Sequence, residues 1–261
     1  MQRGAAPTVR GMLFLLHGAP GDGSLWEPVV SRLPAGIRVA TPTFRCFGPG
    51  AEASPDAFGT SVHSHQLIEW LESADERPAA VAAWSYSTHV VLDVLLRRPE
   101  LVSRAFLYEP GLHTYLDDPE DLRAYRRDAQ VAFAPVAEAL QRDGPLRAVE
   151  ALFESSGGPG CFAALPPGRR ERYLAGAQVM PLLMGGGRPP ASITADDLGR
   201  IVVPVTVAMG ARTRPLFAIA SRAVARAIPE ARLTVVENAD HMFPEVDPGR
   251  FAALLEAWLT S

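Results

Sequence analysis

The sequence predicts an α/β protein with a mainly parallel central sheet of about six or seven strands flanked by helices. Two observations support this prediction. Short apolar runs alternate with amphipathic helical patterns along most of the chain, as in βαβ units. The alternation is interrupted once by a long stretch that holds only helical patterns, and this indicates helices inserted between two strands of one sheet.

The predicted strands are short apolar runs bounded by turn residues. They are Met12–Leu16, Ile37–Ala40, Ala79–Ala83, Ala105–Tyr108, Val203–Met209 and Leu233–Val236. The predicted helices between them carry apolar residues at helical spacing. They are Leu25–Leu33, Ala57–Ala74, Tyr86–Arg97, Leu216–Ala227 and Gly249–Leu259.

The interruption covers residues 112–197. Helical patterns occur there at Pro119–Arg142, Pro145–Phe153 and Arg169–Leu183, separated by segments rich in glycine and proline. We expect residues 1–111 and 198–261 to form the core and residues 112–197 to form a helical cap. Because open α/β sheets bind ligands at the carboxyl ends of their strands, we expect the cap to lie over a binding site at that edge.

The composition excludes several classes of function. Of the 261 residues 48% are hydrophobic and 21% are charged. The net charge is −4, and acidic and basic residues are mixed along the chain. Binding to nucleic-acid phosphates needs a basic stripe, so no nucleic-acid partner is expected. All 25 basic residues are arginine, which excludes Schiff-base lysines, P-loop lysines and Ser-Lys dyads.

No metal or cofactor is expected, and a small molecule is the expected partner. Cys46 and Cys161 have no companion cysteines at metal-ligand spacing, so each is expected to be a free thiol. His63 and His65 lie two positions apart on a predicted helix and point to different faces, which disfavours a shared metal. An apolar leader and a run of about 18 apolar residues are both missing, which favours a cytoplasmic location without a membrane partner. The oligomeric state stays open.

Ser85 stands where an apolar strand pattern passes directly into a helical pattern. A serine at such a turn presents its hydroxyl clear of the sheet, and the new helix directs backbone N–H groups toward whatever the serine attacks. The usual pattern is G-x-S-x-G, and here Ala83 and Ser87 hold the glycine positions with side chains small enough for a sharply folded backbone. The alternative interpretation is a serine that caps the helix.

Two other segments carry chemistry. The first predicted strand runs into His17-Gly18-Ala19-Pro20-Gly21, where the backbone is able to curl around a free N–H, as one half of an oxyanion site requires. His241 follows the last predicted strand and precedes the final helix. Each segment alone also fits a tight loop or a packed histidine. Their order along the chain, with Ser85 early and His241 late, is typical of one hydrolase architecture.

Over essentially its whole length the chain resembles the α/β-hydrolase fold family. The resemblance is carried by the HG turn after the first strand and by the stretches AAWSYS, AFLYEPGL and ADHM. It implies that Ser85 is the nucleophile and that His241 is the base.

The same resemblance implies an oxyanion hole made by the backbone N–H groups of Ala19 and Tyr86. His17 and Gly18 are then expected to shape the turn that carries Ala19. Dehalogenases and epoxide hydrolases of this fold use a nucleophilic aspartate, and both chemistries are disfavoured because Ser85 holds that position.

The acid of the triad is the least determined residue. Many family members carry an aspartate after the penultimate strand, but here that strand is followed by Gly210-Ala211-Arg212-Thr213-Arg214. Some relatives, such as haloalkane dehalogenases, carry the acid after the strand that follows the nucleophile helix, and Glu109 occupies that place. A carboxylate behind the imidazole is needed to orient it, and we therefore predict Glu109 as the acid. The alternative is a structural carboxylate that pairs with Arg212 or Arg214.

These observations favour a serine hydrolase that cleaves an ester, thioester or related carbonyl bond of a moderately apolar small molecule through an acyl-enzyme. Two alternatives stay open. One is a non-hydrolytic enzyme on the same fold, such as an acyltransferase, lyase or cyclase. The other is a ligand-binding protein that has lost the chemistry.

Overall fold

The computed structural model describes residues 11–261, and within them the chain forms one six-stranded sheet. All five strand pairs are parallel, and the strand order is β2-β1-β3-β4-β5-β6. The predicted fold class is therefore confirmed. The strands are β1 (Met12–Leu16), β2 (Arg38–Ala40), β3 (Ala79–Trp84), β4 (Val102–Tyr108), β5 (Val205–Gly210) and β6 (Arg232–Val236).

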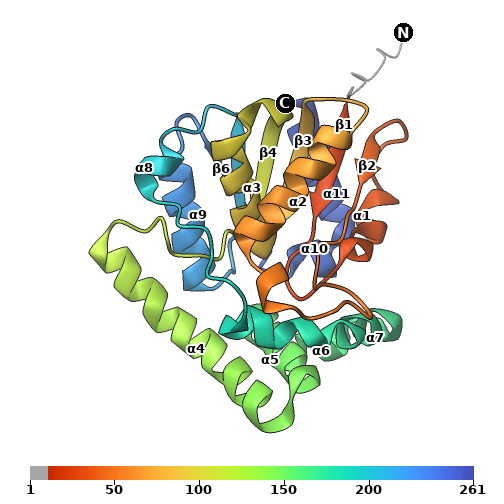
Figure 1. Ribbon diagram of the computed structural model, residues 1–261, viewed down its shortest axis with the longest axis vertical. Helices are drawn as coiled ribbons and strands as arrows, with labels where there is room; N and C mark the ends of the chain where they lie inside the picture. The colour runs from red at the N-terminus through yellow and green to blue at the C-terminus, as the bar shows by residue number, and fades with distance from the viewer. Residues whose placement is uncertain (1–10) are drawn as a thin grey trace.

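Helices cover both faces of the sheet (Figure 1). Successive side chains of a strand point to opposite faces, so Phe14 and Leu16 of β1 join one apolar cluster while Leu13 and Leu15 join the other. Helices α2, α3 and α9 pack in the first cluster, and α1 and α11 pack in the second. Their bounds are α1 (Glu27–Val30), α2 (Thr60–Ser73), α3 (Tyr86–Arg97), α9 (Pro215–Ala227) and α11 (Pro248–Thr260).

The predicted elements differ from the observed ones mainly at their ends. Strand β4 begins at Val102 rather than Ala105, where Val102 pairs with Ala79 of β3. Helix α2 begins at Thr60 rather than Ala57, because Pro55–Ala57 forms a separate 3₁₀ turn and Gly59, with φ of 151°, bends the chain before the helix.

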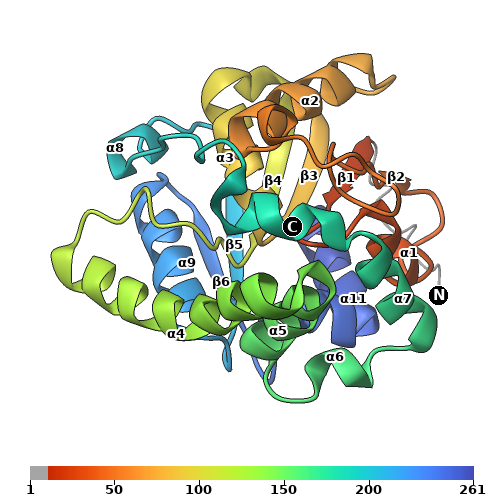
Figure 2. The ribbon, with the colours of Figure 1, turned by 60° about the horizontal axis from the view of Figure 1, so that its bottom comes forward.

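Between β4 and β5 the chain builds helices that lie at the carboxyl edge of the sheet, at the bottom of Figure 1. Figure 2 turns this edge forward and shows them in front of the strands. These helices are α4 (Pro119–Asp143), α5 (Pro145–Gly157), α6 (Cys161–Ala164) and α7 (Pro167–Ala175). The short helix α8 (Ala195–Leu198), which also precedes β5, lies away from this edge and packs against α9 and α3. The cap boundaries at 112 and 197 stay a prediction, and residues 1–10 of the predicted core lie outside the described residues.

The predicted single helix Arg169–Leu183 is wrong. Helix α7 ends at Ala175, and the chain continues as a 3₁₀ turn (Ala177–Val179) and then a π-helical turn (Leu182–Gly186). Gly176 lies between the first two segments with ψ of 5°, and a side chain there would lie 3.4 Å from the backbone of Gly48. The helix thus ends where the backbone of Gly176 packs against the backbone of Gly48.

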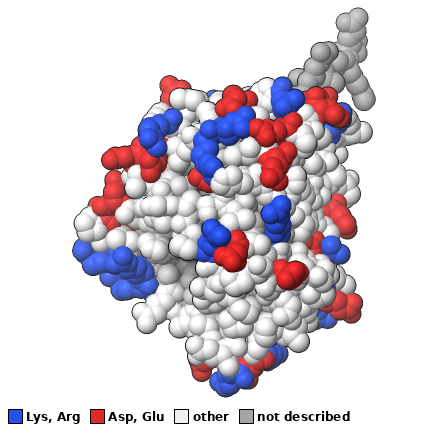
Figure 3. Space-filling model, in the orientation of Figure 1, with Lys and Arg blue, Asp and Glu red and all other residues white. Residues whose placement is uncertain are grey.

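The surface carries charges of both signs. Acidic and basic side chains lie side by side over the upper part of the face drawn in Figure 3. Some charged side chains form ion pairs, such as those of Arg98 with Glu72 and Glu100. Within residues 11–261, every helix is too short or too polar to cross a lipid bilayer.

Gly210 brings the end of β5 against the chain that follows β6. A Cβ atom at this position would overlap the carbonyl group of Ala239 and lie 2.7 Å from the nitrogen of Asp240. Only a glycine lets these two backbones approach so closely. The contact places the end of β5 beside the loop that carries His241.

We expect Gly210→Ala to destabilise the protein by about 2 kcal/mol, because the added methyl group forces two packed backbones apart. The matched control is Gly168→Ala in α7, where nothing lies within 4 Å of the added atom. The free energy of unfolding from urea denaturation measures both changes. Equal stability of Gly210→Ala and the parent protein would contradict the assigned contact.

Candidate active site

Ser85 lies at the sharp turn between β3 and α3. Its backbone has φ of 56° and ψ of −115°, a region that non-glycine residues rarely adopt, and strain of this kind gathers at functional sites. The turn is held by the Ser85 N–H, which donates to the carbonyl oxygen of Tyr108 at 2.9 Å. The Ser85 side chain makes no capping hydrogen bond to the helix. The structure therefore does not support the helix-cap interpretation.

The two residues after Tyr86 stabilise this turn. The Ser87 hydroxyl donates to the carbonyl oxygen of Leu16 at 2.9 Å and accepts from the backbone N–H of Trp84 at 3.2 Å. The Thr88 hydroxyl donates to the carbonyl oxygen of Ser85 at 2.6 Å. Buried hydroxyls thus bind the backbone on both sides of Ser85.

His241 connects Ser85 to Glu109. Its Nε2 lies 3.0 Å from the Ser85 hydroxyl oxygen, and its Nδ1 lies 2.7 Å from Oε2 of Glu109. Because an ionised carboxylate only accepts hydrogen bonds, Nδ1 carries the proton and Nε2 is free to accept from the serine. Ser85 lies 156 positions and Glu109 132 positions before His241 in the sequence, and yet the three side chains form one series of hydrogen bonds.

Glu109 is fully buried at the end of β4, where its φ is 50°. Its Oε1 accepts from the Gly210 N–H at 2.8 Å, and its Oε2 accepts from the Thr213 hydroxyl at 2.7 Å. The alternative partners are engaged elsewhere: Arg212 donates to the Asn238 side chain and Arg214 to Asp128. The carboxylate thus faces the imidazole rather than an arginine.

Three aromatic residues that the sequence analysis did not single out hold the His241 loop. The Phe217 ring stacks on the imidazole, with centroids 3.6 Å apart and planes at 5°. The Trp84 indole N–H donates to the carbonyl oxygen of His241 at 2.9 Å, and the Tyr108 hydroxyl donates to that of Asp240 at 2.6 Å. Trp84 directly precedes Ser85 and Tyr108 directly precedes Glu109 in the sequence. This adjacency is the one feature of the sequence that pointed to them.

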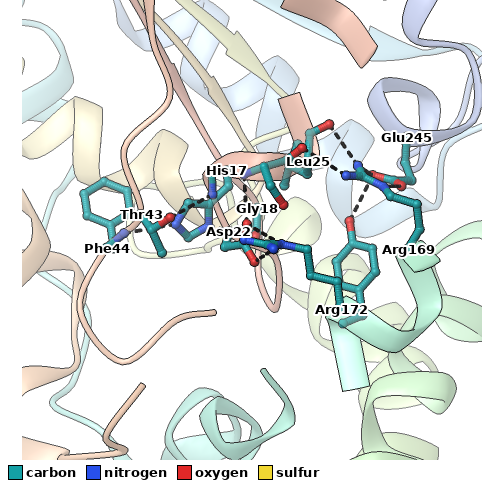
Figure 4. Close-up of polar contacts among 12 residues, drawn as sticks. His17, Gly18, Asp22, Leu25, Thr43, Phe44, Arg169, Arg172 and Glu245 are labelled. Carbon is teal, nitrogen blue, oxygen red and sulfur yellow. Dashed lines mark hydrogen bonds and ion pairs between the residues drawn. The ribbon is translucent and has the colours of Figure 1, made fainter. Parts of the chain in front are cut away.

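His17 holds the predicted oxyanion turn. Its Nδ1 lies 3.1 Å from the carbonyl oxygen of Gly18, and its Nε2 accepts from the backbone N–H of Phe44 at 3.1 Å (Figure 4). The Gly18 carbonyl belongs to the same peptide group as the N–H of Ala19. Burial lowers the pKa of His17 to about 4, so the ring stays neutral and keeps one donor and one acceptor nitrogen.

Ala19, Tyr86, Ser85 and His241 border one cavity, so the structure brings the predicted oxyanion residues to the predicted nucleophile and base. A family model described as "Alpha/beta hydrolase family" matches residues 13–254. The chain belongs to this family.

Two curated relatives match parts of this hydrolase-family chain. A pimeloyl-[acyl-carrier protein] methyl ester esterase from Aromatoleum aromaticum is 35% identical over 36% of the chain, and a putative carbamate hydrolase from Rhizobium rhizogenes is 24% identical over 55%. The matches span 35% and 53% of those relatives' own lengths. Among solved structures, a thermophilic esterase from Thermogutta terrifontis aligns with a TM-score of 0.69, covering 96% of this chain and 89% of its own at 21% identity.

The cavity beside Ser85 is strongly apolar. Its volume is about 310 Å³, and none of the described residues that line it is an aspartate, glutamate or arginine. Residues from the core and from the inserted helices line it together. The aromatic ones are Trp84, Tyr86, Tyr125, Phe133, Phe153, Tyr173 and Phe217.

Two ion pairs, which Figure 4 shows together, connect helix α7 to the chain after the His17–Gly21 turn and to the chain after His241. Arg172 pairs with Asp22, the residue that follows the oxyanion turn, with its Nε 2.8 Å from Oδ2. Arg169 forms two 2.8 Å hydrogen bonds to Glu245, which lies just after His241 and also accepts from the Tyr173 hydroxyl at 2.9 Å. Although burial opposes ionisation of Asp22, the hydrogen bonds from Arg172 and Ser24 lower its pKa overall.

His63 is a further buried imidazole, for which the sequence predicted only that it does not share a metal with His65. Its Nδ1 lies 2.7 Å from the Tyr86 hydroxyl, and its Nε2 lies 3.1 Å from the carbonyl oxygen of Arg45. Burial and the nearby His17 lower its pKa to about 4. The structure brings it close to Ser85 through Tyr86, a contact for which the sequence holds no pattern.

Stability is expected to fall as the pH is lowered from 7 to 5. His17 and His63 have a pKa of about 4 when folded, against 6.5 as the ordinary value. As the pH falls below 6.5, the two histidines are protonated in the unfolded chain while they stay neutral in the folded protein. The free energy of unfolding therefore decreases as the pH falls from 6.5 toward 4. Each residue contributes about 2 kcal/mol of this loss at pH 5.

The measurement is the free energy of unfolding in urea at both pH values, for the parent protein and for His63→Phe. The difference between the two pH values should be about 2 kcal/mol smaller in the variant. An equal difference in both proteins would show that His63 does not resist protonation.

Proposed function

We propose that this protein is a serine hydrolase that cleaves an ester, thioester or related carbonyl bond through an acyl-enzyme. The observation that carries the proposal is the unbroken chain of hydrogen bonds from Ser85 through His241 to the buried Glu109. A neutral serine hydroxyl is a weak nucleophile, and an adjacent base that is itself held by a carboxylate is the arrangement that activates it.

In the acylation step the Ser85 oxygen attacks the substrate carbonyl carbon while its proton passes to Nε2 of His241. The imidazolium that forms is stabilised by the Glu109 carboxylate. The negative charge on the carbonyl oxygen is held by the N–H groups of Ala19 and Tyr86. When the tetrahedral intermediate collapses, His241 returns its proton to the leaving alcohol or thiol.

In the deacylation step a water molecule takes the place of the leaving group. His241 accepts a proton from this water, whose oxygen attacks the acyl carbon, and the same two N–H groups hold the oxyanion. Collapse of the second intermediate breaks the bond to Ser85, which regains its proton from His241. The products are the carboxylic acid and the free enzyme.

The substrate is an uncharged, moderately apolar small molecule. A charged group would lose its hydration in the cavity without a partner, because no described lining residue carries a formal charge other than His241 when protonated. We propose further that residues 112–197 act as a cap, since α5 contributes Leu152, Phe153 and Ser156 to the cavity wall opposite the core.

Ser85→Ala is expected to lower the turnover of p-nitrophenyl butyrate by about 10⁵-fold, because no other group forms the acyl-enzyme. The matched control is Ser103→Ala on the exposed part of β4, which should keep the parental rate. A fluorophosphonate probe should label the parent protein and not Ser85→Ala, as mass spectrometry of the intact protein would show. Parental turnover in Ser85→Ala would rule out the assigned nucleophile.

Glu109→Gln is expected to lower kcat by about 10³-fold, because an amide in this position favours the wrong tautomer of His241. The control Glu100→Gln changes an exposed carboxylate whose partner is Arg98. Steady-state rates with the same ester measure the effect. If both variants lose equally little activity, the acid of the triad lies elsewhere.

A further inference from the structure

Tyr86 and His63 form a hydrogen-bonded pair beside the nucleophile, in which His63 is fully buried and Tyr86 is partly buried. Both polar contacts of the imidazole have a defined direction. The carbonyl of Arg45 only accepts, so Nε2 of His63 carries the proton and donates to it. Nδ1 is then the acceptor, and the Tyr86 hydroxyl donates to it at 2.7 Å. The phenol group is thus held at its far end by a ring whose tautomer is set by the backbone.

Aromatic rings pack around the His63 end of this pair. The rings of Phe44, Phe47 and Phe58 lie with their centroids 5.1, 5.7 and 5.5 Å from the His63 ring. His63 is fully buried among them. A hydrogen bond in such surroundings is stronger than in water, and loss of either partner would leave an unsatisfied polar atom. The pair therefore has one favourable geometry.

The backbone of Phe44 and Arg45 contacts both His63 and His17. The N–H of Phe44 donates to His17, and the carbonyl of the next residue, Arg45, accepts from His63. His17 in turn donates from Nδ1 to the carbonyl of Gly18, and thereby orients the peptide group that includes the Ala19 N–H. His17 thus connects the Phe44 N–H to the peptide group of Ala19, and His63 connects the Arg45 carbonyl to the side chain of Tyr86. The two rings are neutral and have opposite tautomers.

We propose that His63 is a positioning residue for the oxyanion hole: through the Tyr86 hydroxyl it holds the first residue of α3 so that the Tyr86 N–H points at the developing oxyanion. This proposal rests on the proposed serine hydrolase function. His63 does not touch the reacting atoms. Its effect arises because the side chain and the N–H of Tyr86 belong to one residue, so that a shift of the ring within the cavity wall moves the donor.

Such a role predicts a loss specific to the transition state. An oxyanion donor binds the tetrahedral intermediate more strongly than the planar substrate, so its displacement lowers kcat while leaving KM nearly unchanged. A shift of well under 1 Å in a catalytic group is expected to cost about tenfold in rate. A general loosening of the fold would instead lower stability and weaken substrate binding.

The test uses Tyr86→Phe, His63→Phe and the double variant, with p-nitrophenyl butyrate as substrate. We expect kcat to fall about tenfold in each single variant and KM to stay within about twofold. The double variant should be no slower than either single variant, because the two residues act through one hydrogen bond. His65→Phe is the matched control, since His65 lies on the same helix with its side chain exposed.

A second measurement separates positioning from general disruption. Butylboronic acid forms a reversible tetrahedral adduct with a catalytic serine, and one of its oxygens takes the place of the oxyanion. Its inhibition constant should rise in Tyr86→Phe and His63→Phe by the same factor by which kcat/KM falls. Urea denaturation reports whether each variant is folded, and Tyr86→Phe alone decides the matter if His63→Phe does not fold.

The outcomes distinguish this inference from the proposed function. If the parent protein turns over the ester in a Ser85-dependent manner while Tyr86→Phe keeps the parental kcat, the positioning role is wrong and the hydrolase assignment stands. A fall in kcat without a change in the boronate inhibition constant overturns the role as well. If turnover does not depend on Ser85, both proposals fail together.

Discussion

The hydrogen bond between Glu109 and His241 is the contact on which the rest of the site depends. It joins the end of β4 to the loop after β6 across the end of β5, whose Gly210 donates to the same carboxylate. The carboxylate is buried, and it is stable there because three donors converge on its two oxygens. Those donors reach it only because the parallel strands end together at one edge of the sheet.

The tautomers of three imidazoles in the site are fixed by their hydrogen-bond partners. His241, His17 and His63 each have one ring nitrogen opposite a group that only accepts or only donates, so each tautomer is determined by a backbone or carboxylate partner. For His17 and His63, burial keeps the ring neutral and the pattern intact. Backbone contacts thus orient the side chains around Ser85 and His241, an arrangement that suits the proposed reaction, whose charge develops at a known position.

The inserted helices add the apolar wall and a set of charged ties. Arg169 and Arg172 lie three residues apart on α7, and so they face the core on the same side of the helix. Their partners, Glu245 and Asp22, belong to the loops that carry His241 and Ala19. Helix α7, which contributes Tyr173 to the cavity wall, is thus bound to the two loops whose positions matter most for the proposed chemistry.

Much of the fold followed from local patterns. Apolar runs marked the positions of all six strands, and α3 begins and ends where its periodicity predicted, because strand and helix periodicities are properties of neighbouring residues. The break at Gly176 escaped prediction, since it reflects the approach of a distant backbone. The prediction of Ser85 and His241 rested on their positions at strand ends, and the structure brings the two together.

The sequence by itself determined the order of strands and helices, the sharp turn at Ser85 and the strand-end positions of His241 and Glu109, because these depend on local spacing and residue size. The tertiary structure alone decided that Glu109 faces His241 rather than an arginine, that Phe217 stacks on the imidazole, and that His63 reaches Tyr86. Each of these contacts joins residues from different elements. Which residues meet depends on how the strands and helices pack against one another, and this packing produces no periodic pattern in the sequence.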